Sequence, residues 1–500
     1  MLKIFPFSEA KIEINVLRIL LGFGSFLIVG IATVFVPIQS LVPLALSAVA
    51  FTISIFDITS GLAFIFFIFA FLPDTTGVDL GLVLPTLDSR RLLLLGFDLA
   101  VVINFRSKFW TKVSSRGLSN INRAIFLFII FQLLSAVTSV DRWASIKSIG
   151  EGILFFFIPY FIMTQYRFSE YHQKKILVAL FIGALAIAML SFVEAAGGIN
   201  PFLLFTPLRE SLTSLYATEL RANLMRSQSS FGHPIAFGMY LLIVIPIGIW
   251  LGARKGQSSV SFWFFGTCIM VGAMFLTISR GPILGMLVSL IFLAVKSPPP
   301  MRRVARILLA VILLGGAALT ASLGPGLFVR EFIANTISPF SDPYSMGASN
   351  VIGRLYLLRY GLQAWLSRPL LGYGPGTSAS GYIAGFGFSQ FTVFTDIANY
   401  YLLLLVENGA LGFALAVVLF GLVLHNLSKG LFRSKLDVAS EANGLRYALF
   451  AVALSVMVTL ATVTVKNSLP IYWMLLGIGV RLANDSGRLS AGSSRRVLYK

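Results

Sequence analysis

Residues 231–252 read FGHPIAFGMYLLIVIPIGIWLG and contain no Asp, Glu, Lys or Arg. A helix needs about 20 mostly apolar residues to cross the hydrocarbon core of a bilayer. This stretch meets that length, so it predicts a membrane-spanning helix. The composition of the rest of the chain decides whether this span is one of many.

Similar apolar stretches recur along the whole chain. Of its 500 residues, 57% are hydrophobic and only 12% are charged, whereas soluble domains carry about 25% charged residues. We therefore expect an all-α fold, a polytopic transmembrane helix bundle with about 12–14 spans. The candidate spans are 17–36, 39–56, 58–72, 90–105, 122–140, 149–165, 174–193, 231–252, 261–279, 282–296, 305–322, 399–425, 445–465 and 468–481.

Loops assigned alternately to the two sides of the membrane divide the charges unequally. One set, which includes both termini, holds 26 Lys or Arg against 8 Asp or Glu, and the other holds 13 against 12. Basic residues concentrate in cytoplasmic loops, so we expect both termini in the cytoplasm. The net charge of +19 is then mostly a topology signal. We expect no nucleic-acid partner, because no soluble region is present to bind one.

The loops divide the chain into three expected regions. Residues 1–193 hold the N-terminal spans, 194–425 a core with long outer stretches at 194–230 and 323–398, and 426–500 the last spans and a cytoplasmic tail. The expected cytoplasmic loops are short, and the sequence has no G-x-x-x-x-G-K-[ST] phosphate loop. We therefore expect the working surface outside, with energy supplied by the substrate and with no cofactor or metal.

The first long outer stretch contains three candidate site residues. Arg221 and Arg226 precede a Ser/Gly turn, and His233-Pro234 opens the next span. His233 is the only histidine that this topology places outside. A His-Pro pair also suits the start of a helix, where proline is favoured in the first turn. His233 is therefore either a helix cap or a site residue.

Arg280 lies between two spans that are joined by almost no loop, in FLTISRGPILGML (275–287). A cation at the edge of the hydrocarbon is costly and is by default a functional-site hypothesis. The alternative is a side chain that snorkels to the lipid headgroups. The tight turn formed by Ser279, Gly281 and Pro282 restricts the direction of Arg280, which favours a functional role.

The second long outer stretch contains a predicted amphipathic helix that lies on the membrane or on the bundle. Its apolar positions recur at helical spacing: Leu355, Leu358, Leu362, Trp365 and Leu366. Arg354 and Arg359 lie about 140° apart around such a helix, so they cannot both face one site, and we prefer Arg354. The glycines that follow, between 372 and 387, allow a close approach of the backbone to a ligand or simply make the segment flexible.

The last segment with candidate residues reads TDIANYYLLLLVENGALGFAL (395–415). Asp396 lies at the mouth of a span, Asn399 one turn inside it and Glu407 two turns deeper. A carboxylate within a span must be paired or protonated. We expect Glu407 to pair with another helix.

These segments, in this order, resemble the O-antigen ligase and Wzy-type polysaccharide polymerase superfamily. The resemblance implies an integral glycosyltransferase of the bacterial inner membrane that needs neither a nucleotide sugar nor a metal. It also implies an undecaprenyl-diphosphate-linked oligosaccharide donor, a glycan or lipid A–core acceptor, and a periplasmic active face. The residues that carry the resemblance are Arg226 to Gly238, Ser279-Arg280-Gly281, Gly353-Arg354, Pro369, Gly372-Tyr373-Gly374, Asn399, Tyr401, Leu402, Glu407, Gly409 and Gly412.

One departure from the family pattern favours a polymerase over a ligase. Ligases typically carry a histidine directly before the asparagine of the last motif, and this chain has Ala398 there. We expect Asp396, then His233, as the base for the acceptor hydroxyl, and Arg280 as the residue that stabilises the diphosphate leaving group. The expected substrate-binding residues are Arg221, Arg226, Arg354, Tyr373 and Asn399.

A transporter or flippase for lipid-linked glycans is the alternative function. It would share the spans, the outer arginines and the lipid partner. Many transporters are built from internal repeats, and no repeat is visible between the halves of this sequence. A purely structural membrane protein is a third possibility.

Overall fold

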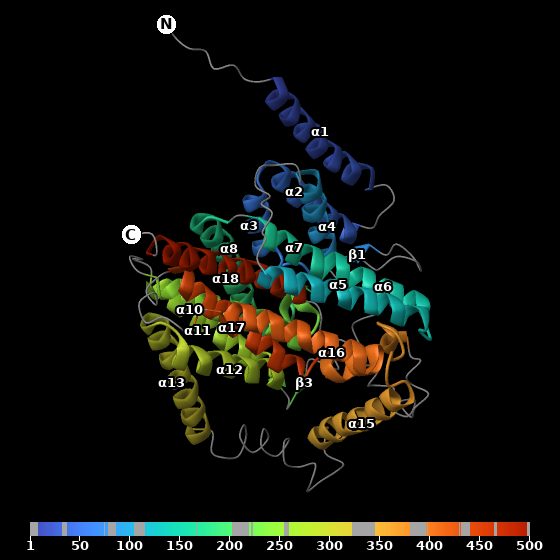
Figure 1. Ribbon diagram of the computed structural model, residues 1–500. Helices are drawn as coiled ribbons and strands as arrows, with labels where there is room; N and C mark the ends of the chain where they lie inside the picture. Colours follow the sequence, from blue (N-terminus) through green and yellow to red (C-terminus); the bar gives the residue numbers. More distant parts are fainter. Residues whose placement is uncertain are drawn as a thin grey trace. The chain divides into compact units, whose positions relative to one another are not determined.

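The computed structural model (Figure 1) is helical almost throughout the part of the chain that it describes, which confirms the expected all-α polytopic bundle. Two antiparallel pairs of two-residue strands are the exceptions: β1 (Gly77–Val78) with β2 (Leu87–Asp88), and β3 (Leu220–Arg221) with β4 (Leu224–Met225). The described residues are 9–32, 38–74, 76–78, 87–104, 116–166, 168–202, 220–221, 224–254, 260–322, 346–380, 397, 399–429, 431, 441–464 and 468–497.

Each stretch predicted to span the membrane overlaps a helix within the described residues. Within the described residues, 6 helical segments are long and apolar enough to cross a bilayer: Asn120–Val137, Arg142–Gln165, Glu170–Gly197, Pro234–Gly252, Tyr400–Ser428 and Asn443–Leu460. The other predicted spans form helices that are shorter or more charged. The total of 12–14 spans therefore stays a prediction.

The chain folds as two compact units, and each is described by itself. Unit 1 comprises Met1–Lys112, Gln165–Ala217 and Ser229–Gly232. Its helices are α1 (Glu9–Ala32), α2 (Ile38–Phe56), α3 (Ile58–Ile68), α4 (Ser89–Ile103) and α8 (Glu170–Gly197), with the 3-10 turn η4 (Ser229–Phe231). Small residues set the close crossings in this unit: Gly96 of α4 lies against Ser47 of α2, and Gly183 of α8 lies against the backbone of Phe67. Small residues bring helix backbones together in the same way in membrane bundles generally.

Unit 2 comprises Val113–Thr164, Thr218–Gln228 and His233–Lys500. Its first helices are α5 (Arg116–Val137), α6 (Arg142–Gly152), the π-helical turn η2 (Ile153–Phe157) and α7 (Ile158–Gln165). They are followed by α10 (Pro234–Gly252), α11 (Val260–Leu276), α12 (Arg280–Lys296) and α13 (Pro299–Ser322). The last are α15 (Met346–Ser367), the 3-10 turn η6 (Thr377–Ser380), α16 (Tyr400–Ser428), α17 (Glu441–Leu460) and α18 (Leu469–Val497).

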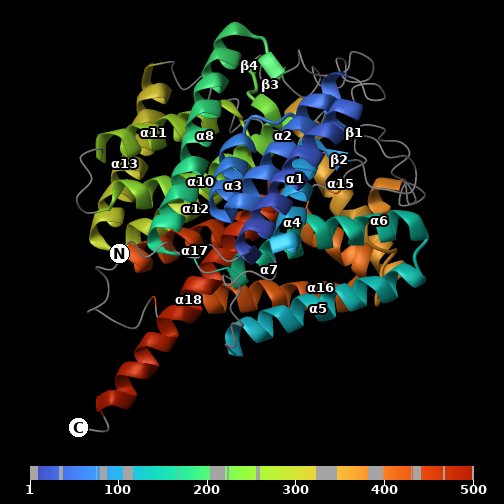
Figure 2. The same ribbon diagram turned by 90° about the horizontal axis from the view of Figure 1, so that it is seen from above.

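The helix α10 forms the centre of unit 2, and α11, α12 and α17 pack around it. It is apolar on every side, and nearly all of its residues are buried, as expected for a helix enclosed by others. In both views α5 runs beside α16 (Figures 1 and 2), and the two helices are in contact. The sequence 231–252 thus decides the fold of this unit by supplying its buried axis.

Arginines close the carbonyl ends of several helices in unit 2. Arg302 donates two hydrogen bonds to Ser297 O, at 3.1 and 2.9 Å, and Arg306 donates to Ala294 O at 3.1 Å, both at the end of α12. Arg446 donates to Leu427 O at 3.4 Å at the end of α16. A cation at a helix C-terminus satisfies open carbonyls and complements the helix dipole. Basic residues interpreted as topology signals therefore also cap helices.

Candidate functional site

Arg226 holds the turn that connects α11 to α12. Its side chain is 8% exposed, and its Nε donates to Thr277 O at 3.0 Å while Nη2 donates to Ser279 Oγ at 3.1 Å. The next residue, Ser227, donates its backbone N–H to Leu276 O at 3.0 Å. The segment before α10 is thereby fastened to the turn that precedes Arg280.

The residue between these two hydrogen-bonded positions, Ile278, has an unusual backbone conformation. Its φ is 47°, in the left-handed region, where a β-branched residue is a genuine outlier. Holding a non-glycine residue there costs roughly 1–2 kcal/mol. The Arg226 side chain binds on both sides of Ile278, so it contributes directly to keeping this strained turn in place.

His233 caps α10, as one of the two interpretations given above predicts. Its Nδ1 accepts a hydrogen bond from the backbone N–H of Ile235 at 3.1 Å, and Pro234 occupies the first helical turn. Because Nδ1 accepts, the neutral imidazole carries its proton on Nε2. His233 precedes the span, and burial together with the nearby charge of Arg226 lowers its pKa to about 4. The ring is therefore neutral at pH 7 and presents an N–H donor.

Arg280 is the first residue of α12 and is partly buried. The start of α12 lies close to α17, because a side chain at Gly281 would collide with Thr462 and one at Gly285 with Thr459. Thr459 Oγ1 also lies 3.4 Å from Gly281 O, within hydrogen-bonding range. Arg280 is thus placed by a fixed turn on one side and by close helix packing on the other.

Asn399 caps α16, and the side chain of Tyr401 joins that helix to α17. Asn399 Oδ1 accepts from the backbone N–H groups of Tyr401 and Leu402, at 3.0 and 3.1 Å. Tyr401 OH donates to Met457 O at 2.8 Å. Thr459, near the end of α17, and Thr462, just past that end, follow Met457 and contact α12. The starts of α12 and α16 therefore lie at the same end of unit 2.

Two more helix starts lie at this end. A Cβ at Gly238, in the first turns of α10, would lie 2.9 Å from Pro282 of α12. Ser468, directly before α18, donates through its hydroxyl to Ala236 O at 3.0 Å. The starts of α10, α12, α16 and α18, with Arg226, His233, Arg280 and Asn399, therefore form one end of the unit, which we call the Arg280 end.

The helix α16 is broken at Gly409, whose φ is 64° and ψ is −174°. The loop from Pro369 to Gly374 pairs with the backbone at this break. Tyr373 N–H donates to Val406 O at 3.0 Å and Gly374 N–H to Glu407 O at 2.8 Å, and Ala410 N–H donates to Pro369 O at 2.8 Å. A break within a membrane helix is tolerated where protein groups satisfy the freed backbone, as here.

Glu407 lies directly before the break and is 4% exposed. Its Oε1 accepts from the backbone N–H of Ser378 at 3.2 Å and from the Ser378 hydroxyl at 2.5 Å. The predicted pairing of Glu407 with another helix of the bundle is not what these contacts show, because its partner Ser378 belongs to the 3-10 turn η6 in the loop before α16. The carboxylate ties the glycine-containing loop to α16.

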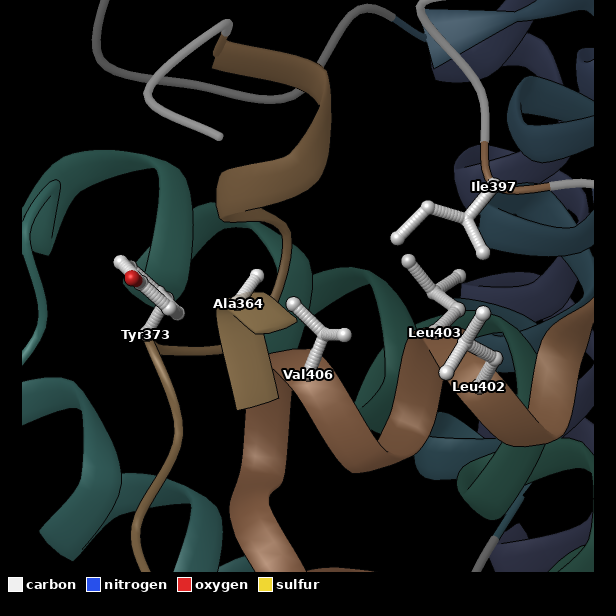
Figure 3. Close-up of a cluster of buried hydrophobic side chains, with 6 residues drawn as sticks. All are labelled: Ala364, Tyr373, Ile397, Leu402, Leu403 and Val406. Atoms are coloured by element: carbon white, nitrogen blue, oxygen red, sulfur yellow. The ribbon is translucent and has the colours of Figure 1, made fainter. Parts of the chain in front are cut away.

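Tyr373 belongs to a buried apolar cluster that joins α15 to α16 (Figure 3). Its hydroxyl lies 2.7 Å from Ser367 Oγ, and Arg368 lies over its ring, 5.1 Å from the centroid. The side chain is 6% exposed. The cluster consists of Ala364, Tyr373, Ile397, Leu402, Leu403 and Val406.

Three of the expected site residues are only partly or not at all described. Asp396 lies outside the described residues, and Arg221 in β3 and Arg354 in α15 are described by their backbone alone. In the helical register of α15, Arg354 falls near the face of Gly361, which packs on Leu402 of α16. Arg359 is exposed.

Sequence reasoning missed the break at Gly409 and the threonines of α17. The dipeptide Asn408-Gly409 within an apolar run was an available signal, because Asn-Gly marks turns and breaks. Thr459 and Thr462 lie in an ordinary mixed apolar sequence that gives no comparable signal. Within the described residues, no group of three His, Cys, Asp or Glu side chains could hold a metal ion.

Unit 1 contains a separate buried polar cluster around the turn η4, which sequence reasoning also missed. Arg90 Nη2 donates to Ser230 O at 3.3 Å and to Ser230 Oγ at 3.2 Å, and the guanidinium lies 3.8 Å from the centroid of the Phe231 ring. Arg90 forms a 3.7 Å ion pair with Asp74, and Glu194 accepts from Ser229 N–H at 2.9 Å. These contacts fix the turn η4 within unit 1.

Comparison with known proteins gives one family match. Residues 265–417 match the family model described as O-antigen ligase. The match includes Arg280, the α15 region and the break in α16, but Arg226 and His233 lie outside it. It confirms the resemblance drawn from the motifs and implies, at a coarse level, glycan transfer of the O-antigen ligase or polymerase type. The chain matches no curated protein.

Proposed function

We propose that this chain, which is similar to the O-antigen ligase family over residues 265–417, is a membrane glycosyltransferase acting on undecaprenyl-diphosphate-linked glycans. In this proposal it polymerises glycan repeats at the outer face of the bacterial inner membrane, with transfer to lipid A–core as the second choice. The donor is a lipid-linked oligosaccharide, and the acceptor is a sugar hydroxyl.

The observation that carries the proposal is the placement of Arg280 at the first turn of α12. A guanidinium offers planar paired donors for phosphate oxygens, and a helix N-terminus adds partial positive charge. When the bond between C1 and the diphosphate oxygen breaks, the leaving diphosphate takes the electron pair and gains negative charge. Donors fixed in advance near that oxygen stabilise the transition state.

Arg226 acts on the turn before Arg280 rather than on the diphosphate. Two of its donor nitrogens are used on Thr277 and Ser279. By holding Ile278 in its strained conformation, it keeps Arg280 in one position. Pre-positioned charge is effective because no reorganisation is needed during the reaction.

The acceptor hydroxyl must lose a proton as its oxygen attacks C1. We assign Asp396 as the base, since it comes three residues before the helix cap Asn399 in the sequence. Neutral His233 is a poor candidate, because its Nδ1 already accepts from Ile235 and its Nε2 carries a proton. His233 would instead donate to a sugar or phosphate oxygen.

The charge distribution supports an outward-facing Arg280 end. The arginines that cap helices, Arg302, Arg306 and Arg446, close the opposite ends of α12 and α16, and basic residues favour the cytoplasmic side. Reporter fusions at 110, 300 and 435 should therefore report the cytoplasm, and fusions at 215 and 345 the exterior. An exterior signal at 300 would overturn this orientation.

Glycan length on the lipid carrier tests the proposed reaction. In a strain that lacks the protein, a polymerase defect leaves single repeats on undecaprenyl diphosphate, whereas a ligase defect leaves full-length chains that are not attached to an acceptor. If single repeats instead accumulate only on the cytoplasmic side of the membrane, the flippase alternative is correct and the proposal is wrong.

A further inference from the structure

The helix α15 has two apolar faces, and only one of them is used inside the protein. Leu357, Gly361 and Ala364 form the inner face: Leu357 and Ala364 are 5% and 0% exposed, and Gly361 lies against Leu402 of α16. At about 100° per residue, the four leucines of the other face lie about 90° to 180° around the helix from the middle of this inner face.

The outer face is a stripe of leucines, Leu355, Leu358, Leu362 and Leu366, which are 56%, 44%, 38% and 64% exposed. Contiguous exposed apolar surface on a protein marks a contact with another apolar phase or partner. Within the described part of the chain, nothing covers these side chains. We call them the α15 leucine stripe.

The α15 leucine stripe leads into the apolar outer surface of α16. After α15 ends, Leu370 is 61% exposed, and its carbonyl lies 3.4 Å from the backbone N of Leu411, which is itself 50% exposed. Further along α16, Val417 and Val418 are also exposed. Because α16 is long and apolar enough to span a bilayer, its exposed face contacts lipid, and the stripe continues that surface.

The direction and the margins of α15 fit a helix lying along the membrane. Figure 1 shows α15 running obliquely to α16 rather than parallel to it. Trp365, at one margin of the stripe, donates through its indole N–H to Pro369 O at 3.0 Å, and exposed Arg359 lies at the other margin. Trp and Arg are typical of the boundary between hydrocarbon and headgroups.

We propose that α15 is an in-plane membrane anchor, with the α15 leucine stripe inserted among the acyl chains of the leaflet on the Arg280 end. The occupant of this surface is bilayer lipid. The inference goes beyond the proposed glycan transfer and does not depend on it, since it concerns how the segment before the α16 break is held at the membrane surface.

Spin-label accessibility tests the proposal in the full chain. Starting from Cys268→Ser, which removes the natural cysteine, single cysteines are introduced by Leu355→Cys, Leu358→Cys, Leu362→Cys and Leu366→Cys. The matched controls are Gln363→Cys, an exposed position off the stripe, and Ala364→Cys on the buried face. Each protein is labelled with a nitroxide and reconstituted into phosphatidylethanolamine/phosphatidylglycerol vesicles.

Oxygen concentrates in hydrocarbon, whereas a nickel chelate stays in water. At the stripe we expect a ratio of oxygen to nickel accessibility severalfold higher than at Gln363→Cys, while Ala364→Cys is protected from both. Nickel access equal to that of Gln363→Cys would mean a water-facing stripe and would overturn the proposal. Protection from both reagents would show that another segment or a second copy covers it, and would overturn it too.

A final comparison separates bilayer lipid from the lipid tail of the donor. The vesicles above contain no polyprenyl lipid, so the expected oxygen access must already be present in them. Access that develops only after undecaprenyl diphosphate is added would assign the stripe to the donor chain and contradict the in-plane anchor. Failure of the glycan-transfer proposal would leave all these measurements unchanged.

Discussion

Nη2 of Arg226 donates to Oγ of Ser279, 53 positions further along the chain, at 3.1 Å. This hydrogen bond, with the one from Nε to Thr277 O, encloses Ile278 in its left-handed conformation. The position of Arg280 therefore depends on a residue from a different loop. Arg226 therefore shapes the site, whereas Arg280 is the residue proposed to contact the substrate.

Arg226→Ala should lower polymer synthesis on the order of tenfold to a hundredfold, because a buried acceptor left without its donor costs about 1–3 kcal/mol. Ile278→Gly should restore about tenfold of this loss in the double variant, since glycine adopts a positive φ without the cost of roughly 1–2 kcal/mol. Polymer yield at matched membrane expression is the measurement. Ile278→Gly alone is the control and should be nearly normal. If Ile278→Gly does not restore polymer yield in the double variant, Arg226 does not act through the turn and instead binds the substrate directly.

Arg280→Lys should lower polymer synthesis by about 10² to 10³, the usual cost of removing one fixed donor from a developing anion. Lysine keeps the charge but loses the planar paired donors that match phosphate. The protein level in the membrane should stay normal, as checked by immunoblotting. Near-normal polymer from Arg280→Ala would show that the side chain only snorkels to headgroups.

Asp396→Asn should lower chain growth by about 10² to 10⁴, the range expected for loss of a general base. His233→Asn should have a much smaller effect, because asparagine is a good helix cap and also retains an N–H donor. Polymer length on gels compares the two variants at equal expression. Full-length polymer from Asp396→Asn would show that Asp396 is not the base. Stabilisation of the leaving group by the arginines would then be the remaining source of catalysis.

The cap at His233 should make stability depend on pH. Its pKa in the folded protein, about 4, is below the ordinary value of 6.5, so the folded state disfavours protonation. The stability contribution is complete above pH 6.5 and decreases as the pH falls towards about 4. Thermal unfolding in detergent should show a larger decrease in Tm over this window for the wild type than for His233→Asn. Equal decreases would contradict a neutral histidine cap.

Gly409→Ala should destabilise the folded protein strongly. A side chain there would collide with Leu370 O, and φ is 64°, which alone costs roughly 1–2 kcal/mol for a non-glycine residue. Gly421→Ala is the matched control in the same helix, since no atom lies within 4 Å of its added Cβ. Thermal unfolding in detergent compares them. A Tm for Gly409→Ala equal to that of Gly421→Ala would show that the break is dispensable.

Hydropathy was sufficient to predict where the helices lie, because each span in a bilayer must satisfy its own backbone. The stretch 231–252 became the buried axis α10, and the leucine spacing from Leu355 to Leu366 became α15. His233 and Asn399 are predicted as site residues, and the structure gives both a capping role. An asparagine before an apolar run, or a proline at the first helical position, can indicate such a cap.

Long-range pairings were not predictable in the same way. Nothing local to Arg226 identifies Thr277 and Ser279 as its partners. The dipeptide Asn408-Gly409 can indicate a break, but nothing near it identifies the loop 369–374 that pairs with the break. Both features depend on segments that are distant in sequence, so hydrophobic periodicity cannot predict them. Asp396 is proposed as the base from its place in the sequence, three residues before the cap Asn399.

The loop that fills the break in α16 precedes that helix in the chain, and this order matters during biosynthesis. Residues 369–374 emerge from the ribosome before 406–410, so the carbonyl and amide groups that pair with the break are already available when α16 enters the bilayer. An unsatisfied backbone group costs several kcal/mol in hydrocarbon. We therefore expect the two half-helices to insert where the loop can already satisfy the break, an order that a circular permutation placing this loop after α16 would reverse.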